Sequence, residues 1–253
     1  MNILTIVASN KDRLQLNHKP SEFFVKSIQW QDFKDFELLI ADGGSSNYNE
    51  VKDWLEHYDG PIKMRIIQSK IDLFSRSYLN NIGIRNATTE YAASTDADML
   101  FARDFMYNVS LLLRPNTLIE SRTMYWKLPL VDKIYSGKLD PYKDIDSCKI
   151  GRIKKRTSAG GFQCMDVKSW DKLHGFDEKY LVWGSEDYDL LTRAQMARLN
   201  IKWMGENNDI RLFHQPHAKK DIKMDLAWQA KNKKLLNNIK DYRANLNIDW
   251  GKI

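Results

Sequence analysis

The first hundred residues alternate between short apolar runs and segments in which apolar residues recur with helical spacing. The apolar runs predict strands at residues 2–9, 36–44, 62–69 and 90–100. The helical spacing predicts helices at residues 20–31, 49–58 and 75–88. Strands and helices that alternate in this way are typical of a mostly parallel, doubly wound sheet. The pattern therefore predicts an α/β fold in which helices flank one sheet.

Local signals support two of these helices. Pro20 stands in the first turn of its helix, where the missing amide proton is tolerated, and Ser75 is placed to cap the third helix. With that start, Leu79, Ile82 and Gly83 would face the interior.

The second half of the chain is less regular. A strand precedes a helix that runs from about Asp166 to Gly175, and a second, stronger helix follows in residues 183–199. Short strands are predicted at 201–204 and 210–214, followed by a lysine-rich helix. Residues 135–156 carry few periodic apolar positions and include the basic run KIGRIKKR, which indicates a long excursion. Neither an internal repeat nor a linker-like composition divides the chain, so we predict a single domain over residues 1–253.

Composition narrows the class of protein. Of the 253 residues, 43% are hydrophobic and 28% are charged, which is typical of a globular protein with a full core. No run approaches the roughly 18 apolar residues of a membrane span, and MNILTIVASNKDR is interpreted as a first strand, not a signal peptide. The isolated Cys148 and Cys164 argue against a zinc or disulfide framework. We therefore expect a reducing, cytoplasmic location.

The net charge of +6 favours anionic partners, namely nucleic acid, phosphate-bearing substrates or an acidic membrane surface. Charge alone does not choose among them. No nucleic-acid-binding motif is present, and the aromatic residues do not cluster with the basic runs. We therefore expect no nucleic-acid partner, and keep a nuclease or nucleic-acid-binding protein as an alternative of a different class. A peripheral membrane contact through the basic C-terminal segment is kept open.

Acidic residues follow two of the predicted strands, at the sheet edge where ligands of doubly wound folds bind. The first group is ADGGSS, in which Asp42 precedes two glycines that allow a close approach to a ligand. Equally, Asp42 and Ser45 could only cap backbone amides of the turn. The second group is TDAD, in which Asp96 and Asp98 are hard oxygen ligands suited to Mg²⁺ or Mn²⁺. Its alternative is a solvated turn.

The segment WGSEDYD combines an aromatic residue, a glycine and three carboxylates. Ser185 is a plausible helix cap, and Glu186, Asp187 and Asp189 would lie in the first turn, where the helix dipole favours negative charge. A carboxylate held rigidly there, beside Trp183 as a platform for a sugar ring, could also act as a general base. Farther on, the imidazole side chains of FHQPH are either metal ligands or structural residues.

The order of these motifs resembles that of GT-A-fold glycosyltransferases of the large inverting family 2. ADGGSSN is similar to their acidic turn, and SRSYLNNIGIRNATTEYAASTDADM is similar to their helix-strand-D-x-D passage. The stretch AGGFQCMDVKSWDKLHGFDEKYLVWGSEDYDLLTRA resembles the C-terminal module of β-1,4-galactosyltransferases and chondroitin-polymerase-like enzymes. The resemblance covers residues 2–100 and 157–217. It implies a donor half in residues 1–100 and an acceptor half in residues 101–253.

The resemblance also implies a role for each matching residue. The nucleotide-sugar donor would contact Asp42, Arg13, Arg76, Asn80, Asp96, Gly160 and Gly161. The acceptor would contact Trp183, Gly184 and Glu186. The base that deprotonates the attacking hydroxyl would be Asp187. The metal would be bound by Asp98, Asp96 and His214, with His217 as second choice and Arg211 at the position of a metal-binding methionine.

From this resemblance we expect a hexosyltransferase that depends on Mn²⁺ or Mg²⁺ and inverts the anomeric carbon. The donor would be a nucleotide sugar, UDP-linked and of the Gal, GalNAc, GlcNAc or Glc type, and the acceptor a hydroxyl of a glycan or glycoconjugate, as in polysaccharide biosynthesis. The alternative within the same fold is retaining transfer of the polypeptide GalNAc-transferase type. Asp187 argues against it, because the related motif lacks an acid after the glutamate.

Overall fold

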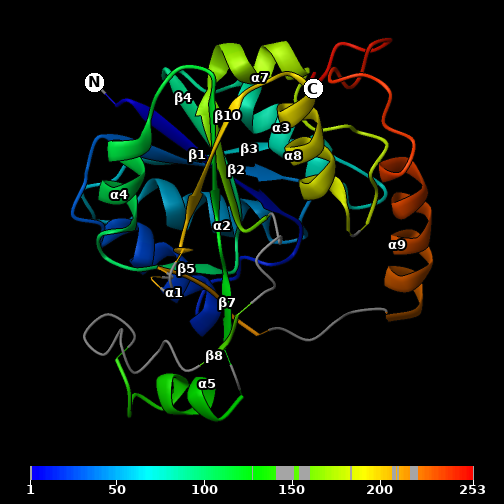
Figure 1. Cartoon of the computed structure of the whole chain (residues 1–253). Coiled ribbons are helices and arrows are strands. Elements are labelled where there is room, and N and C mark those ends of the chain that lie inside the picture. The colour runs from blue at the N-terminus through cyan, green and yellow to red at the C-terminus, as the bar shows by residue number, and fades with distance from the viewer. Residues whose placement is uncertain are drawn as a thin grey trace.

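The apolar runs of the first half form adjacent parallel strands on one side of a seven-stranded sheet (Figure 1). The strands are β1 (Leu4–Asn10), β2 (Phe36–Asp42), β3 (Met64–Gln68), β4 (Tyr91–Asp96), β6 (Thr117–Ser121), β9 (Phe162–Asp166) and β10 (Asn200–Met204). Their order is β10-β6-β9-β4-β1-β2-β3. Only β9 runs antiparallel to its neighbours, so the predicted mostly parallel sheet is confirmed.

The computed structural model describes residues 2–126, 128–140, 151–153, 160–182, 184–206, 209, 211–216 and 222–252. Three residues singled out from the sequence, Cys148, Trp183 and His217, lie outside the described residues, as does most of the predicted excursion at 135–156.

Helices cover both faces of the sheet, as the predicted doubly wound arrangement requires. One face packs against α1 (Lys19–Gln29), α2 (Tyr48–Glu56) and α4 (Phe105–Leu112). The other packs against α3 (Arg76–Arg85), α7 (Val167–Leu173) and α8 (Glu186–Met196). The helix α3 lies very close to the sheet, because a Cβ on Gly83 would come within 2.1 Å of Val7 Cγ1.

A second, four-stranded sheet was not predicted as a sheet. It contains β5 (Met99–Phe101), β11 (Leu212–His214), β7 (Met124–Trp126) and β8 (Gly151–Ile153), in that order, and leads into α5 (Leu128–Tyr135). Its strands are three residues long, too short for an alternating pattern to identify. This sheet carries His214 to a position beside the turn that follows β4.

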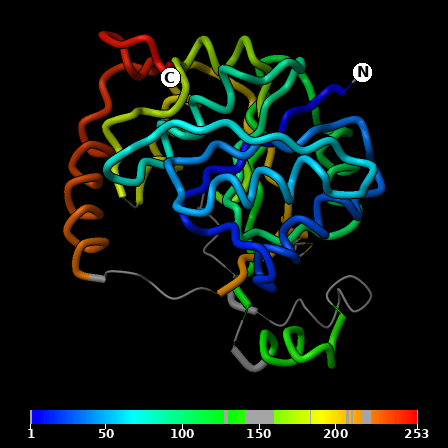
Figure 2. Tube along the Cα trace, turned by 180° about the vertical axis from the view of Figure 1, so that it is seen from behind, coloured from blue at the N-terminus to red at the C-terminus, as the bar shows by residue number. Residues whose placement is uncertain are grey.

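The lysine-rich helix is confirmed as α9 (Ile222–Leu236), which stands along one side of the molecule (Figures 1 and 2). Asn232 Nδ2 ties it to the loop before α8 by a hydrogen bond of 2.9 Å to the Leu181 carbonyl. The chain then returns to α7, where the Ala244 amide donates to the Leu173 carbonyl at 3.0 Å. None of the helices in the described part of the chain is long and apolar enough to span a membrane.

The predicted caps differ in outcome. Ser75 Oγ accepts a hydrogen bond from the Tyr78 amide at 3.2 Å, and Asp166 caps α7 through the Ser169 amide at 3.0 Å. Ser185 lies at the predicted N-cap position of α8, but its side chain makes no capping hydrogen bond. Ser185 adopts a left-handed conformation with φ of 79°, whereas capping residues usually have extended backbone.

Candidate active site

Arg76 joins two acidic segments that lie far apart in the sequence. It is the first residue of α3, and its Nε donates to Asp96 Oδ1 at the end of β4, at 2.5 Å. One of its terminal nitrogens forms ion pairs with Asp187 and, at 3.5 Å, with Glu186, both in the first turn of α8. The arginine side chain is 10% exposed. The predicted donor residues Arg76 and Asp96 and the predicted acceptor and base residues Glu186 and Asp187 thus form one cluster.

The cluster holds more negative charge than a single arginine can balance. Burial opposes the charged form of Arg76, but Asp187, Asp96 and Glu186 outweigh it and raise the pKa of the guanidinium well above its usual value. Burial, with a contribution from the Asp187 charge, raises the pKa of Glu186 to about 7. A ligand that brings positive charge would therefore be favoured at this site.

Gly160 and Gly161 form the wall opposite α8. Both have left-handed backbone, with φ of 96° and 88°. A Cβ on Gly160 would lie 2.2 Å from Asp187 Oδ2, and one on Gly161 would lie 2.3 Å from Thr123 Oγ1. Only glycine therefore allows this loop to approach Asp187 so closely.

The candidate metal ligands lie next to this cluster. His214 Nε2 is 3.7 Å from Asp98 Oδ1, and the His214 ring stacks on Tyr125 with 4.7 Å between ring centroids. The Gln215 amide donates to the Asp98 carbonyl at 3.1 Å, which fixes the turn against β11. A carboxylate and an imidazole within reach of one ion fit Mn²⁺ or Mg²⁺ when phosphate oxygens complete the shell. Within the described residues no group of three potential metal ligands is found. The carboxylate of Asp96, the third predicted ligand, forms an ion pair with Arg76.

Asp42 is buried and its carboxylate is occupied by groups of the chain itself. Its Oδ1 accepts from the amides of Gly44 and Ser45, at 2.9 and 2.8 Å. Its Oδ2 accepts from Asn10 Nδ2 at 2.7 Å and from Ser45 Oγ at 2.5 Å. The capping interpretation of this turn is thereby supported, and a contact between Asp42 and the nucleotide stays a prediction.

The other residues singled out from the sequence lie in four different positions. Asn80 is fully buried in α3, and both polar atoms of its side chain lack a hydrogen-bond partner in the part of the chain that the structure describes. Arg13 is half-buried beyond β1, and its amide donates to Asn10 Oδ1 at 3.2 Å. Gly184 precedes α8 with φ of 100°. Arg211 forms ion pairs with Asp104 and Asp209, which engage its guanidinium outside the acidic cluster.

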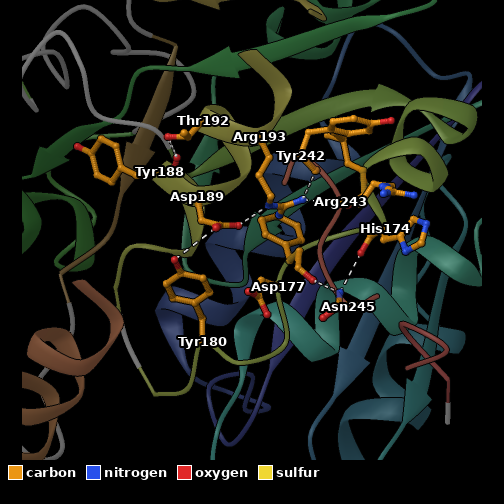
Figure 3. A network of polar contacts seen from close by, with 12 residues as sticks. His174, Asp177, Tyr180, Tyr188, Asp189, Thr192, Arg193, Tyr242, Arg243 and Asn245 are labelled. Atoms are coloured by element: carbon orange, nitrogen blue, oxygen red, sulfur yellow. Dashed lines mark hydrogen bonds and ion pairs between the residues drawn. The ribbon is translucent and has the colours of Figure 1, made fainter. Parts of the chain in front are cut away.

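The third carboxylate of WGSEDYD serves the interior instead of the site (Figure 3). Asp189 is 2% exposed and pairs with Arg193 Nε at 2.7 Å, one turn along α8. Tyr180 donates its hydroxyl to the same carboxylate at 3.4 Å. Arg193 also donates to the carbonyls of Leu173 and Tyr242, so this pair connects α8, α7 and the C-terminal segment. The sequence interpretation had grouped Asp189 with the first-turn charges.

Sequence reasoning missed Glu120, a fully buried carboxyl group on β6. It accepts a hydrogen bond from Gln163 Nε2 at 2.8 Å and lies near Asp187. The only signal was a glutamate inside the short apolar stretch TLIES, which is unusual for a buried strand.

Comparisons with known proteins point to transfer of sugars. A family model described as the N-terminal domain of galactosyltransferase matches residues 142–217. Two curated relatives are each 27% identical over 117 residues, which is 45% of this chain. Both are named as uncharacterized glycosyltransferases, one from Rickettsia felis and one from Rickettsia conorii, and the chain spans 19% of their length. These matches support a glycosyltransferase.

Solved structures decide the fold. TarS of S. aureus in complex with UDP-GlcNAc superposes with a TM-score of 0.59 at 10% identity, over 86% of this chain and 60% of that one. The fold is that of the GT-A glycosyltransferases. A mannosyltransferase from Pyrobaculum calidifontis with GDP-Man and Mn²⁺ gives a TM-score of 0.59 at 18% identity, over 94% and 65% of the two chains. GalNAc-T7 with UDP, GalNAc and Mn²⁺ gives 0.62 at 10% identity, over 86% and 44%. The predicted fold class is confirmed.

Proposed function

We propose that this GT-A chain is a metal-dependent, inverting glycosyltransferase. It transfers a hexose of the Gal, GalNAc, GlcNAc or Glc type from a UDP-linked donor to a hydroxyl group of a glycan or glycoconjugate. The observation that carries the proposal is the cluster around Arg76, in which Asp96, Glu186 and Asp187 meet beside Gly160.

In this proposal Asp187 is the general base. It lies at the rigid start of α8 and against Gly160, where the donor sugar would be bound. As the acceptor oxygen bonds to the anomeric carbon, Asp187 takes the proton of the acceptor hydroxyl. The bond from that carbon to the diphosphate oxygen breaks, and the nucleoside diphosphate leaves with the electron pair. Attack from the face opposite the leaving group inverts the anomeric carbon.

Asp98 and His214 would hold the divalent cation, which supplies charge neutralisation at the departing diphosphate. The stacking of His214 on Tyr125 orients the imidazole for this purpose. Asp96 and Arg76 would align the ribose and the diphosphate, because Arg76 connects Asp96, two residues before Asp98, to the proposed base Asp187. Glu186 would accept a hydrogen bond from a hydroxyl of the acceptor.

The test is a panel of nucleotide sugars, with UDP-Gal, UDP-GalNAc, UDP-GlcNAc, UDP-Glc and GDP-Man, each with Mn²⁺, Mg²⁺ or EDTA. We expect at least one UDP-sugar to raise the melting temperature and to release UDP in a cation-dependent manner. If no nucleotide diphosphate or nucleotide sugar stabilises the protein, the proposal is wrong. Proton NMR of the first product distinguishes inversion from the retaining alternative, since retention would keep the anomeric configuration of the donor.

We further propose that α9 mediates a peripheral contact with an anionic membrane. Four of its lysines are exposed, namely Lys223, Lys231, Lys233 and Lys234, and Met224 and Leu226 are 41% and 57% exposed beside them. Basic and apolar groups side by side suit the surface of a bilayer. Sedimentation with vesicles of phosphatidylglycerol should retain the protein, whereas vesicles of phosphatidylcholine should not. Equal binding to both lipids, or to neither, contradicts this contact.

A further inference from the structure

A row of buried polar side chains crosses the sheet beneath the catalytic cluster. Gln163 on β9 lies opposite Ser94 on β4 and opposite Glu120 on β6 in the strand register. All three side chains are fully buried. Two positions away on the same three strands, Ala92, Met165 and Leu118 belong to the core beneath α3, α7 and α8. Side chains two positions apart lie on the same face of a strand, so the row of polar side chains faces the same helices.

Two contacts connect Glu120 to the active site. Gln163 Nε2 donates to Glu120 Oε1 at 2.8 Å and also reaches the Asp187 carbonyl at 3.5 Å. The Gly160 amide faces the Glu120 carboxyl group, and Gly160 abuts the Asp187 side chain. Glu120 therefore lies, through Gln163, beneath the place where the glycine loop meets α8.

The surroundings of Glu120 favour its uncharged form. Burial raises its pKa to about 8, and the Asp187 charge acts in the same direction, while Gln163, Gly160 and the charge of Arg76 oppose them. The charged groups that act on it are Asp187 from α8 and Arg76 from α3, whereas β4 and β9 contribute the neutral Ser94 and Gln163. On the remaining side, β10 places Trp203 opposite Glu120. Of its two oxygens, Oε1 accepts from Gln163 and Oε2 is buried without a hydrogen-bond partner among the described residues. A buried carboxylate that is only partly hydrogen-bonded is costly, so a neutral acid is the stable state.

We propose that Glu120 is a positioning residue of the transfer site, an uncharged carboxylic acid that holds Gln163 against the Asp187 carbonyl and thereby sets the position of Asp187 relative to the donor-sugar loop. The inference rests on the proposed glycosyltransferase function. In this proposal Glu120 does not contact the substrate. Its effect is expected in kcat, because a displacement of about 1 Å at a reacting group can cost about 10²-fold in rate.

The activity test compares Glu120→Gln with Glu120→Met. Glutamine keeps an acceptor for Gln163 Nε2 and cannot ionise, so we expect kcat at pH 7 within about threefold of the wild type. Methionine has a similar volume but no acceptor, and we expect kcat to fall about 10–100-fold with KM for the donor little changed. Above pH 8 the wild type should lose activity as Glu120 ionises beside Asp187, and Glu120→Gln should not. Unchanged kcat in Glu120→Met, or the same alkaline loss in Glu120→Gln, overturns the proposal.

A stability measurement decides the state of Glu120 even if no donor is found. Because its folded-state pKa lies above that of an exposed glutamate, its contribution to stability is full below about pH 4.5 and is lost as the pH rises toward 8. The Glu120→Gln variant should therefore gain stability relative to the wild type between pH 5 and pH 8. A difference that does not change with pH overturns the neutral acid. An inactive wild type with the expected pH-dependent difference refutes the proposed function alone.

Glu37 on β2 provides the matched control. It is another buried strand glutamate, but its hydrogen bond and ion pair with Arg65 outweigh burial and lower its pKa. It has no contact with the site. Glu37→Gln should lose stability at pH 7 and leave the alkaline limb of the activity profile unchanged. If it removes that limb as Glu120→Gln does, the limb does not report on Glu120.

Discussion

The first turn of α8 contributes carboxylates to two arginine–carboxylate centres, and the two centres differ in charge balance. At the first centre, Arg76 meets three carboxylates, those of Asp96, Glu186 and Asp187, and one of its terminal nitrogens serves two of them. At the second, Arg193 pairs with one carboxylate among the described residues, that of Asp189, and its Nη1 donates to two backbone carbonyls. The first centre has excess negative charge beside the carboxyl edge of the sheet. The second, drawn in Figure 3, pairs one positive with one negative charge and is buried.

The difference separates a functional acid from a structural one in the same short motif. A balanced, buried pair is complete without a ligand, and its removal affects stability. A cluster with excess negative charge can bind a cation or accept a proton during the reaction, so removing one of its carboxylates affects activity. The two centres can therefore be tested against one another.

The largest effect is expected from Asp187→Asn. Loss of the proposed base should lower kcat about 10²–10⁴-fold, because general bases contribute rate enhancements of this size. UDP binding, measured by calorimetry, should survive, and so should the melting temperature. Asp171→Asn on the exposed part of α7 is the control and should keep full activity. Transfer at the wild-type rate by Asp187→Asn would remove Asp187 as base.

The second centre should respond in the opposite way. Asp189→Ala leaves the buried Arg193 without its carboxylate, and breaking such a pair costs about 3–5 kcal/mol. Urea unfolding should show this loss in the free energy of unfolding. At a temperature where the variant is folded, kcat should stay near that of the wild type. A stable variant with strongly reduced kcat would place Asp189 in the active site and contradict its structural role.

Arginine-to-lysine changes at the two centres sharpen the contrast. A lysine cannot reproduce the forked contacts of Arg76 to Asp96 and Asp187, so Arg76→Lys should lower kcat/KM about 10²-fold. Arg193→Lys should instead lower stability by about 1–3 kcal/mol through carbonyls left unpaired. Kinetic and unfolding measurements on both proteins check the pair. Equal losses of activity in the two variants would contradict separate roles.

The smallest effect is a change in the pH dependence of stability. The raised pKa of Glu186 means that the folded protein binds this proton more tightly than the unfolded chain. Its contribution to stability is full below about pH 4.5 and is lost as the pH rises toward 7. Glu186→Gln should therefore gain stability relative to the wild type across this range, as measured by thermal unfolding. A variant whose relative stability is flat with pH would show that Arg76 already keeps Glu186 charged.

The main sheet was predictable because its signals are local. Each parallel strand of the first half is an apolar run bounded by polar residues, and α3 begins at a serine cap that its own sequence provides. The second sheet was not predictable, since its three-residue strands become strands only by pairing with distant segments. The position of the Ser185 cap was also predictable, but the absence of its side-chain bond was not, because Gly184 and Ser185 both adopt a left-handed backbone that a capping serine does not usually have.

By itself, the sequence determined the order of strands and helices, the acidic turns after β2 and β4, and the carboxylates at the start of α8. These features follow from spacing, capping and helix-dipole preferences within a few residues. Only the tertiary structure decided which charges meet: Arg76 reaches Asp187 across 111 positions of the chain, while Asp189 turns to Arg193. It also decided that Asp42 is occupied by Asn10 and Ser45, and that Glu120 lies beneath the site. Charge pairing and burial depend on the packing of distant elements, and no local pattern encodes that packing.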